Sequence, residues 1–257
     1  MMKKISMYVV THKKVDKKFD DNMYKFIQVG KSVDDASINE VKDNTGDNIS
    51  KKNSNYCELT AMYWIWKNDK KSDIVGITHY RRFFSKNILD SIKKKPIEKK
   101  EINILLNKFD IIVPEPLIMR KGTVFKQYSD SHFANDLYIT RQVISEIYPE
   151  YLDSFDNVMN RNYYSACNMI ICNKHIYDYY MKWLFDILFE VEKRVDISNY
   201  DAYNKRIFGF ISERLLNVWL NANRQYSIKE LPIYNTENHD DGIISIIKYK
   251  IKSLLKR

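Results

Sequence analysis

Short apolar runs rich in β-branched residues recur along this chain with amphipathic helical patterns between them, and this alternation limits the fold more than any other feature. The runs lie at residues 5–11, 26–29, 73–78, 109–113 and 166–172. Helical patterns occupy residues 55–67, about 174–194 and about 202–221. Strands and helices at this spacing predict an α/β fold with a mostly parallel sheet flanked by helices. Ligands bind such sheets outside the carboxyl ends of the strands.

The length of 257 residues suits one hydrophobic core with a small appendage. We therefore expect one domain at residues 1–235 and a basic amphipathic C-terminal helix at residues 236–257. Residues 242–257 combine Ile and Leu with five basic residues. Such a helix either lies in a membrane interface, with Lys toward anionic headgroups, or packs on the core with its basic face in solvent.

The chain carries 42 Lys and Arg against 33 Asp and Glu, a formal net charge of +9. This excess predicts attraction to a phosphorylated substrate or an anionic membrane surface, although an AT-rich genome produces the same bias. Nucleic acid is not predicted as a partner, because no zinc-ligand spacing, RNA-recognition signature or basic region leading into heptads occurs. Three cysteines without C-x-x-C spacing predict reduced thiols, and no signal-like or membrane-spanning apolar run occurs. We expect a cytoplasmic protein, either free or bound to the inner face of the cell membrane.

His79, Tyr80, Arg81 and Arg82 follow directly after the run at 73–78. Two adjacent arginines on an extended backbone point to opposite faces, so we expect one guanidinium to reach a ligand while the other stabilises the fold. An arginine matches a diphosphate through paired charge-assisted hydrogen bonds, and His79 adds a proton donor or a phosphate contact. From the residues alone, surface arginines beside a buried histidine explain the pattern equally well.

A polar loop at residues 46–58 leads into the first helical pattern, with Ser54 or Asn55 as the expected N-cap. Backbone amides at such a helix start bind anions, and Asn48 offers a side chain to a nucleotide or sugar. The alternative is a simple capped loop.

Two glutamates interrupt otherwise apolar helical patterns. Glu58, expected near the third helical position, needs a partner if it is buried, and Arg81 or Arg82 is the expected one. Glu213 stands beside Arg214 in the segment FGFISERLL. Two roles are open for Glu213: a general base whose pKa is raised by burial, or half of a buried ion pair.

His132 and Asp136, in the segment HFAND, are together the alternative candidate for the general base. No Asp-x-Asp triplet, P-loop, GxGxxG or nucleophile elbow occurs in the sequence. No metal site and no cofactor are therefore predicted, while dependence on Mn or Mg stays open. The charge of a leaving diphosphate would then be met mainly by cations of the protein.

Several segments together are similar to a known bacterial family. They are YVVTHK, GDNIS, NYCELTAMYWIWKN, THYRRFF, FDIIVPEP, CNMIIC and FGFISERLLNVWL, and the likeness runs from about residue 4 to residue 220. The sequence resembles a family long described as a domain of unknown function, found in capsular and exopolysaccharide clusters, whose members are usually described as glycosyltransferases. The resemblance implies a GT-A-like nucleotide-sugar-binding fold. It also implies transfer of a sugar from a nucleoside diphosphate, such as a UDP-hexose or UDP-galactofuranose, to a lipid-linked repeat unit of a surface polysaccharide.

By the HYRR and SERL motifs, the resemblance implies that six positions matter, without a role for each: His79, Tyr80, Arg81, Arg82, Glu213 and Arg214. Individual roles come from the residues and their places after the predicted strands. Glu213, or else His132 or Asp136, is predicted to be the base of an inverting displacement. The expected donor-binding residues are Thr11, His12, Gly30, Asn48, His79, Tyr80, Arg81, Arg82 and Asn168, with Glu58 and Arg214 in ion pairs. Two rival functions are a non-catalytic scaffold that binds polysaccharide or a lipid carrier, and a phosphotransferase or phosphatase that uses the arginines.

Overall fold

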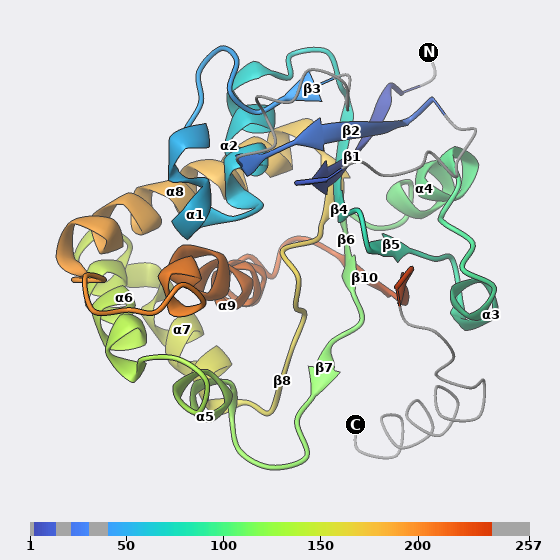
Figure 1. The fold of residues 1–257 in the computed structure, drawn as a ribbon. Helices are drawn as coiled ribbons and strands as arrows, with labels where there is room; N and C mark the ends of the chain where they lie inside the picture. The colour runs from blue at the N-terminus through green and yellow to red at the C-terminus, as the bar shows by residue number, and fades with distance from the viewer. Residues whose placement is uncertain (1–2, 14–21, 31–40, 238–257) are drawn as a thin grey trace.

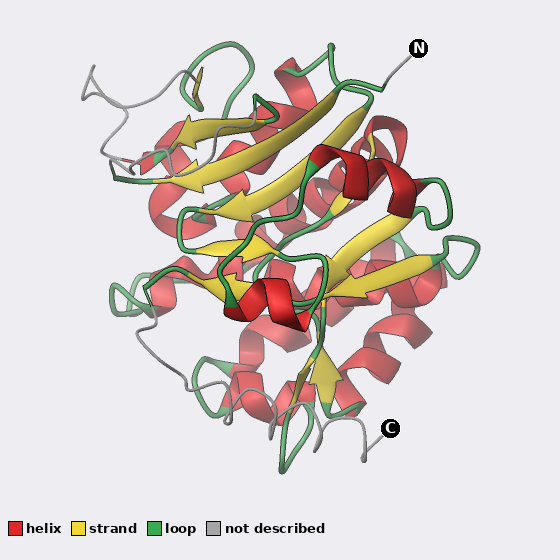
Figure 2. Ribbon diagram, turned by 90° about the vertical axis from the view of Figure 1, so that its right-hand side faces the viewer, coloured by secondary structure: helices red, strands yellow, loops and turns green. Residues whose placement is uncertain are grey.

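The computed structural model describes residues 3–13, 22–30 and 41–237, which form a central sheet with helices on both faces (Figures 1 and 2). The strand order is β10-β6-β9-β4-β1-β2-β3, and β5, which pairs with β4 and β11, extends the sheet. The strands are β1 (Ile5–Thr11), β2 (Tyr24–Gln28), β3 (Val41–Lys42), β4 (Ile74–His79), β5 (Arg82–Phe84), β6 (Ile111–Pro114), β9 (Ile171–Asn173), β10 (Ile228–Leu231) and β11 (Ile233–Asn235). A separate ribbon pairs β7 (Leu117–Ile118) with β8 (Tyr163–Tyr164).

Along the order β10-β6-β9-β4-β1-β2-β3 most neighbouring strands run parallel, which confirms the predicted α/β sheet. β1 pairs in parallel with β2 and β4, and β6 pairs in parallel with β10. β9 lies between β4 and β6 and runs antiparallel to both. The amino end of β9 therefore lies at the same edge as the carboxyl ends of β1 and β4. This reversal brings residues 167–168 beside the segment that follows β4.

Alternating side chains of the strands pack into two cores, one on each face of the sheet. On β1, Tyr8 and Val10 face the larger core, whereas Met7 and Val9 face the smaller one. The larger core is covered by α1 (Asn53–Tyr56), α2 (Leu59–Asn68), α5 (Val124–Ser129), α6 (Ala134–Ile147), α7 (Leu152–Asn160), α8 (Lys174–Arg194) and α9 (Ile207–Ala222). On the other side lie α3 (Ile88–Ile92) and α4 (Lys99–Leu106) (Figure 1). Short 3-10 turns, η2 (Ser50–Lys52), η3 (Pro149–Tyr151) and η4 (Asn204–Arg206), precede α1, α7 and α9.

The first predicted helix is two helices, α1 and α2, separated at Cys57. Cys57 adopts φ 51°, and Glu58 is the N-cap of α2 instead of its third residue. Ser54 and Asn55 were the predicted N-caps, but both lie inside α1, whose N-cap is Lys52. The break follows from packing against α9: a Cβ added to Gly209 would lie 3.4 Å from Cys57 Sγ. The turn at Cys57 directs the start of α2 toward α9.

The two long C-terminal helices agree better with prediction. α8 covers the predicted range, and α9 starts later than predicted because η4 precedes it. Within residues 3–13, 22–30 and 41–237, no helix has the length and apolar character needed to cross a membrane. The predicted C-terminal helix lies outside the described residues from residue 238 onward, so that helix and the domain boundary at residue 235 stay predictions.

Candidate active site

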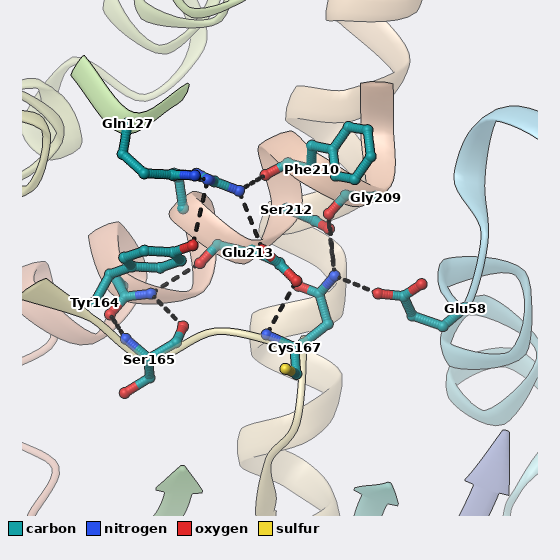
Figure 3. Close-up of polar contacts among 12 residues, drawn as sticks. Glu58, Gln127, Tyr164, Ser165, Cys167, Gly209, Phe210, Ser212 and Glu213 are labelled. Carbon is teal, nitrogen blue, oxygen red and sulfur yellow. Dashed lines mark hydrogen bonds and ion pairs between the residues drawn. The ribbon is translucent and has the colours of Figure 1, made fainter. Parts of the chain in front are cut away.

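A group of polar residues occupies the carboxyl edge of β1 and β4, where ligands bind in sheets of this type. It is built from the β4–β5 hairpin, the segment before β9, the start of α2 and the first half of α9 (Figure 1). Figure 3 shows the polar contacts of Glu58, Cys167 and Glu213. The residues that interact there through hydrogen bonds or charge are Glu58, His79, Arg82, Asn168 and Glu213.

The HYRR motif forms a hairpin and not one extended strand. His79 ends β4 and pairs with Arg82 at the start of β5, so Tyr80 and Arg81 make the turn. The Thr78 hydroxyl donates a hydrogen bond to the carbonyl of Arg82, which fixes the hairpin. The different surroundings of the two arginines therefore arise from a turn, not from the strand alternation that we predicted.

Arg81 and Arg82 differ in their partners. Arg81 forms an ion pair with Glu237 at 3.2 Å. The Arg82 guanidinium makes no hydrogen bond or ion pair with any residue that the structure describes. It lies close enough to Glu213 and His79 to act on both electrostatically. A half-buried guanidinium without a carboxylate partner is suited to bind an anionic ligand.

His79 holds the loop before β9. Its Nε2 lies 2.6 Å from the carbonyl oxygen of Cys167, and since a carbonyl only accepts, Nε2 carries the proton. Burial lowers the pKa of His79, and the charge of Glu58 opposes this only in part. His79 is therefore neutral near pH 7, with its N–H committed to the backbone. This geometry favours a positioning role over the predicted role of proton donor.

The loop that His79 holds has an unusual backbone. Cys167 and Asn168 adopt φ 76° and 48°, in the left-handed region that non-glycine residues rarely occupy. Asn168 is buried, and its Nδ2 donates to Glu58 Oε1 at 2.8 Å and to Ser212 Oγ at 2.8 Å. Its Oδ1 is buried without a partner in the described chain. Such strain costs about 1–3 kcal/mol per residue and persists only where the surroundings impose it, as at functional sites.

Glu213 lies on α9 with one oxygen on the loop and one on an arginine (Figure 3). Oε1 accepts a hydrogen bond from the backbone N–H of Cys167 at 3.0 Å, and Oε2 lies 3.1 Å from Arg214 Nη1. Burial raises the pKa of Glu213, and the charge of Arg214 opposes that rise. The Glu213 side chain is 21% exposed, whereas that of Arg214 is 2% exposed. The ion pair of Glu213 is therefore formed, while the role of Glu213 as a general base stays a prediction that its raised pKa and its exposure allow.

The predicted partner of Glu58 is wrong. Neither Arg81 nor Arg82 bonds to Glu58, which instead accepts the amide hydrogen bond from Asn168. Arg206, just before α9, lies within electrostatic range of Glu58 and donates to Cys57 Sγ at 3.2 Å. Glu58 therefore connects the start of α2 to the loop before β9. Its carboxylate also interacts electrostatically with Arg206, which the sequence pattern did not identify.

Three cations lie within electrostatic range of His12, just beyond the end of β1, and we call Lys13, Arg81 and Arg206 the basic cluster. Burial lowers the pKa of His12, and the charges of these three residues lower it further. Lys13 Nζ lies 3.0 Å from Glu237 Oε1, so Glu237 bridges Lys13 and Arg81. The predicted proximity of His12 to the HYRR motif is confirmed. The basic cluster lies at the sheet edge next to the motif and presents positive charge there.

A family model described as a domain of unknown function, DUF4422, matches residues 6–224, which is most of the chain. The chain belongs to the DUF4422 family. This finding confirms the resemblance inferred from the sequence motifs. No curated protein matches the chain.

A solved structure similar to this DUF4422 chain is the apo structure of WbbM, described as a bifunctional glycosyltransferase. The two chains share 28% sequence identity and superpose with a TM-score of 0.83. The match covers 91% of this chain and 46% of the WbbM chain, so the DUF4422 chain spans about half the length of WbbM. The predicted GT-A-like class, a mostly parallel sheet flanked by helices, thus agrees with the fold of a glycosyltransferase structure.

Three predicted donor-binding residues of the DUF4422 chain make local contacts. The Thr11 hydroxyl is buried and donates to the carbonyl of Lys13 at 2.6 Å. Gly30 has φ 74°, and an added Cβ would lie 2.6 Å from Asn53 Oδ1, so only glycine fits. Asn48 donates to the carbonyl of Gly46 at 2.9 Å. These contacts shape the loops at the sheet edge, and donor binding by these residues stays a prediction.

The predicted pairing of His132 with Asp136 is not formed. Asp136 is buried, and its two oxygens accept hydrogen bonds from Tyr128 at 2.9 Å and Tyr200 at 2.6 Å. Burial raises the pKa of Asp136. His132 Nδ1 instead lies 2.9 Å from Asn204 Oδ1. Because both Asp136 oxygens are occupied in a buried position, the geometry favours Glu213 as the base.

Sequence reasoning placed Lys13 in a loop, residues 10–13, that was expected to hold the nucleoside, but it missed Arg206, Cys57 and Cys167 as parts of this site. Arg206 precedes a helix in a segment with no motif, so the sequence offered no signal for it. The thiols have raised pKa values, about 11 for Cys57 and about 12 for Cys167, mainly because both half-buried groups lose contact with water. In the described residues no cluster of His, Cys, Asp and Glu is suited to hold a metal ion.

Proposed function

We propose that this DUF4422 chain is a glycosyltransferase that moves a sugar from a nucleoside diphosphate to an acceptor hydroxyl. The observation that carries the proposal is the position of Glu213, a reachable carboxylate of raised pKa, within electrostatic range of the unpaired Arg82 at the ligand-binding edge of the sheet. Such a transfer needs a base for the acceptor and cations for the leaving diphosphate. The likeness to WbbM supports the same chemistry.

In the proposed reaction the acceptor oxygen attacks the anomeric carbon as the bond from that carbon to the diphosphate breaks. The bonding electron pair leaves with the diphosphate, and Arg82 and the basic cluster stabilise its negative charge, each donor contributing about 3 kcal/mol. Glu213 takes the proton from the acceptor hydroxyl. A raised pKa makes Glu213 a stronger base than an ordinary carboxylate. A single displacement of this kind inverts the configuration of the transferred sugar.

The loop before β9 positions the proposed base. The backbone N–H of Cys167 binds one oxygen of Glu213, while His79 binds the carbonyl of the same residue. Asn168 fixes the loop to Glu58 and to α9. Rotation of the Glu213 carboxylate is restricted, which reduces the entropy that must be lost when the acceptor binds.

The finer parts of the proposal concern substrates and place of action. We propose a UDP-hexose donor, with UDP-galactofuranose among the donors to test, and a lipid-linked repeat unit of a surface polysaccharide as the acceptor. The net charge of +9 supports attraction to an anionic membrane surface on the cytoplasmic side. No resident metal is part of the proposal, because arginine and lysine supply the positive charge. Activity measured with and without EDTA decides whether the enzyme depends on Mn or Mg.

Nucleotide binding and turnover test the proposal together. UDP, GDP and CMP are titrated into the purified chain by calorimetry, with Mn and with EDTA, and transfer or hydrolysis is then measured with the corresponding sugar nucleotides. Arg82→Ala is expected to weaken nucleotide binding. The matched control is Arg141→Ala, because Arg141 pairs with Asp156 at 2.7 Å on the exposed surface of α6 and α7. A chain that binds no nucleotide and turns over no donor is not a glycosyltransferase, and glycan binding unaffected by Arg82→Ala would favour the scaffold instead.

A further inference from the structure

Three aromatic rings lie together beside the candidate active site, and we call His132, Tyr203 and Phe210 the aromatic platform. The His132 ring stacks on Phe210 with centroids 4.1 Å apart and on Tyr203 with centroids 5.6 Å apart. Tyr203 is 54% exposed, so its ring covers little of the core. An exposed aromatic side chain beside a polar site indicates ligand binding more strongly than a buried one does, because core packing does not require it.

The aromatic platform adjoins both parts of the proposed reaction centre. Phe210 and Glu213 lie three residues apart on α9 and therefore on the same helix face. Arg206, a member of the basic cluster, lies over the rings of Tyr203 and Phe210, 5.8 and 5.3 Å from their centroids. A ligand on the platform is thus close both to the proposed base and to Arg206.

Buried groups behind the aromatic platform hold it rigid. Asp136 accepts hydrogen bonds from Tyr128 and Tyr200. Tyr128 packs against His132 with centroids 4.8 Å apart, and Tyr200 stacks on Phe133 with centroids 4.1 Å apart. A buried carboxylate is costly unless it is fully hydrogen-bonded, so both tyrosines are fixed in place. Asp136 therefore fixes two tyrosines behind the platform, which its sequence position did not indicate.

The chemistry of the aromatic platform suits a neutral ring with polar edges. Burial lowers the pKa of His132, so its ring is uncharged near pH 7 and offers an apolar face. Asn204 and Asp201 form a polar rim, in which Asn204 Nδ2 donates to Asp201 Oδ2 at 3.1 Å. An exposed tyrosine ring bordered by hydrogen-bonding groups matches a sugar ring, which has C–H faces and hydroxyl edges.

We infer that the aromatic platform is the subsite that binds the terminal sugar ring of the acceptor glycan. Its description as an acceptor subsite rests on the proposed function. The sugar ring lies against the exposed ring of Tyr203, and its reacting hydroxyl is directed past Phe210 toward Glu213. The diphosphate of the donor lies at Arg82 and the basic cluster, whose member Arg206 borders the platform.

The test measures saccharide binding in the absence of donor. A panel of methyl hexopyranosides and methyl hexofuranosides is titrated into the full chain and followed by ligand-observed NMR. Tyr203→Ala is expected to weaken glycoside binding about tenfold, the loss expected for removing one stacked ring. Tyr203→Phe keeps the ring and is expected to bind like wild type. Tyr138→Ala, which removes a 59% exposed tyrosine that packs on Phe125, is the matched control.

UDP affinity, measured in the same samples, separates failure of this inference from failure of the proposed function. Wild-type affinity for UDP in Tyr203→Ala, together with lost glycoside binding, supports the acceptor subsite. Equal glycoside binding by wild type and Tyr203→Ala, or none by the wild type, overturns the subsite while leaving nucleotide binding as evidence for the transferase. Glycoside binding on the platform of a chain that binds no nucleotide overturns the proposed function instead.

Discussion

Replacing Glu213 by Gln removes the proposed base with little change of shape. The amide of Glu213→Gln keeps an oxygen to accept the hydrogen bond that the N–H of Cys167 donates at 3.0 Å. It lacks the negative charge that lies 3.1 Å from Arg214. Arg214 keeps its hydrogen bond to the carbonyl of Phe210 at 2.9 Å and its bond to Gln127. The substitution therefore tests proton transfer more than it tests packing.

The expected loss of activity is much larger than the expected loss of stability. A general base contributes about 10²- to 10⁴-fold, which is roughly 2.7–5.4 kcal/mol of transition-state stabilisation. Two effects on stability oppose each other: Arg214 loses an ion-pair partner, while the cost of keeping an ionised carboxylate in a buried place disappears. The net change is expected to be about 1 kcal/mol or less, a shift in Tm of roughly 2–4 °C.

The sign of the pH dependence follows from the raised pKa of Glu213. A carboxyl whose pKa is higher in the folded state contributes stability below its unfolded pKa, and this contribution is lost as pH rises through the folded pKa. The base is active only when ionised, so activity rises over the same window, above the ordinary range for glutamate. The assay is kcat against pH for wild type and Glu213→Gln, with UDP affinity and Tm as controls. If the Glu213→Gln variant kept most of the wild-type kcat and the same fall in kcat at low pH, Glu213 would not be the general base.

Three further substitutions test the surroundings of the base. Arg82→Lys keeps the charge but loses the planar fork, so UDP should bind about tenfold more weakly by calorimetry, and unchanged affinity would argue against a contact with the diphosphate. Glu237→Gln removes the carboxylate that bridges Lys13 and Arg81, so UDP should bind more tightly, whereas weaker binding would mean that Glu237 organises the site. Asn168→Ala leaves Glu58 without its amide donor and should cost about 1–3 kcal/mol in chemical unfolding, and full stability would show that the contact is dispensable.

The layered fold could be predicted because its signals are local. β1 and β4 consist mainly of buried apolar residues, and such short runs are recognisable in sequence. The position of the HYRR motif at a strand end also followed from sequence order alone. The antiparallel direction of β9 did not, because a buried strand has the same apolar pattern in either orientation.

The contacts within the site depend on residues far apart in the chain. Asn168 and Glu58 are 110 residues apart. The sequence around either residue does not indicate that the other is its partner. The left-handed backbone of Cys57 and Cys167 has no local signature, because cysteine does not favour it and packing imposes it. Asp136 was predicted as a base because it is acidic, but its two tyrosine partners give it a structural role.

The central claim is that a nucleoside diphosphate binds at the carboxyl edge of β1 and β4, and a crystal structure of the chain with UDP tests it most directly. The account predicts that Arg82 donates hydrogen bonds to the diphosphate, with Lys13 or Arg81 beside it and the Glu237 carboxylate displaced from both. It also predicts that Glu213 remains open toward the acceptor side. UDP bound at another edge of the sheet, with Arg82 out of reach of both phosphates, would contradict the claim.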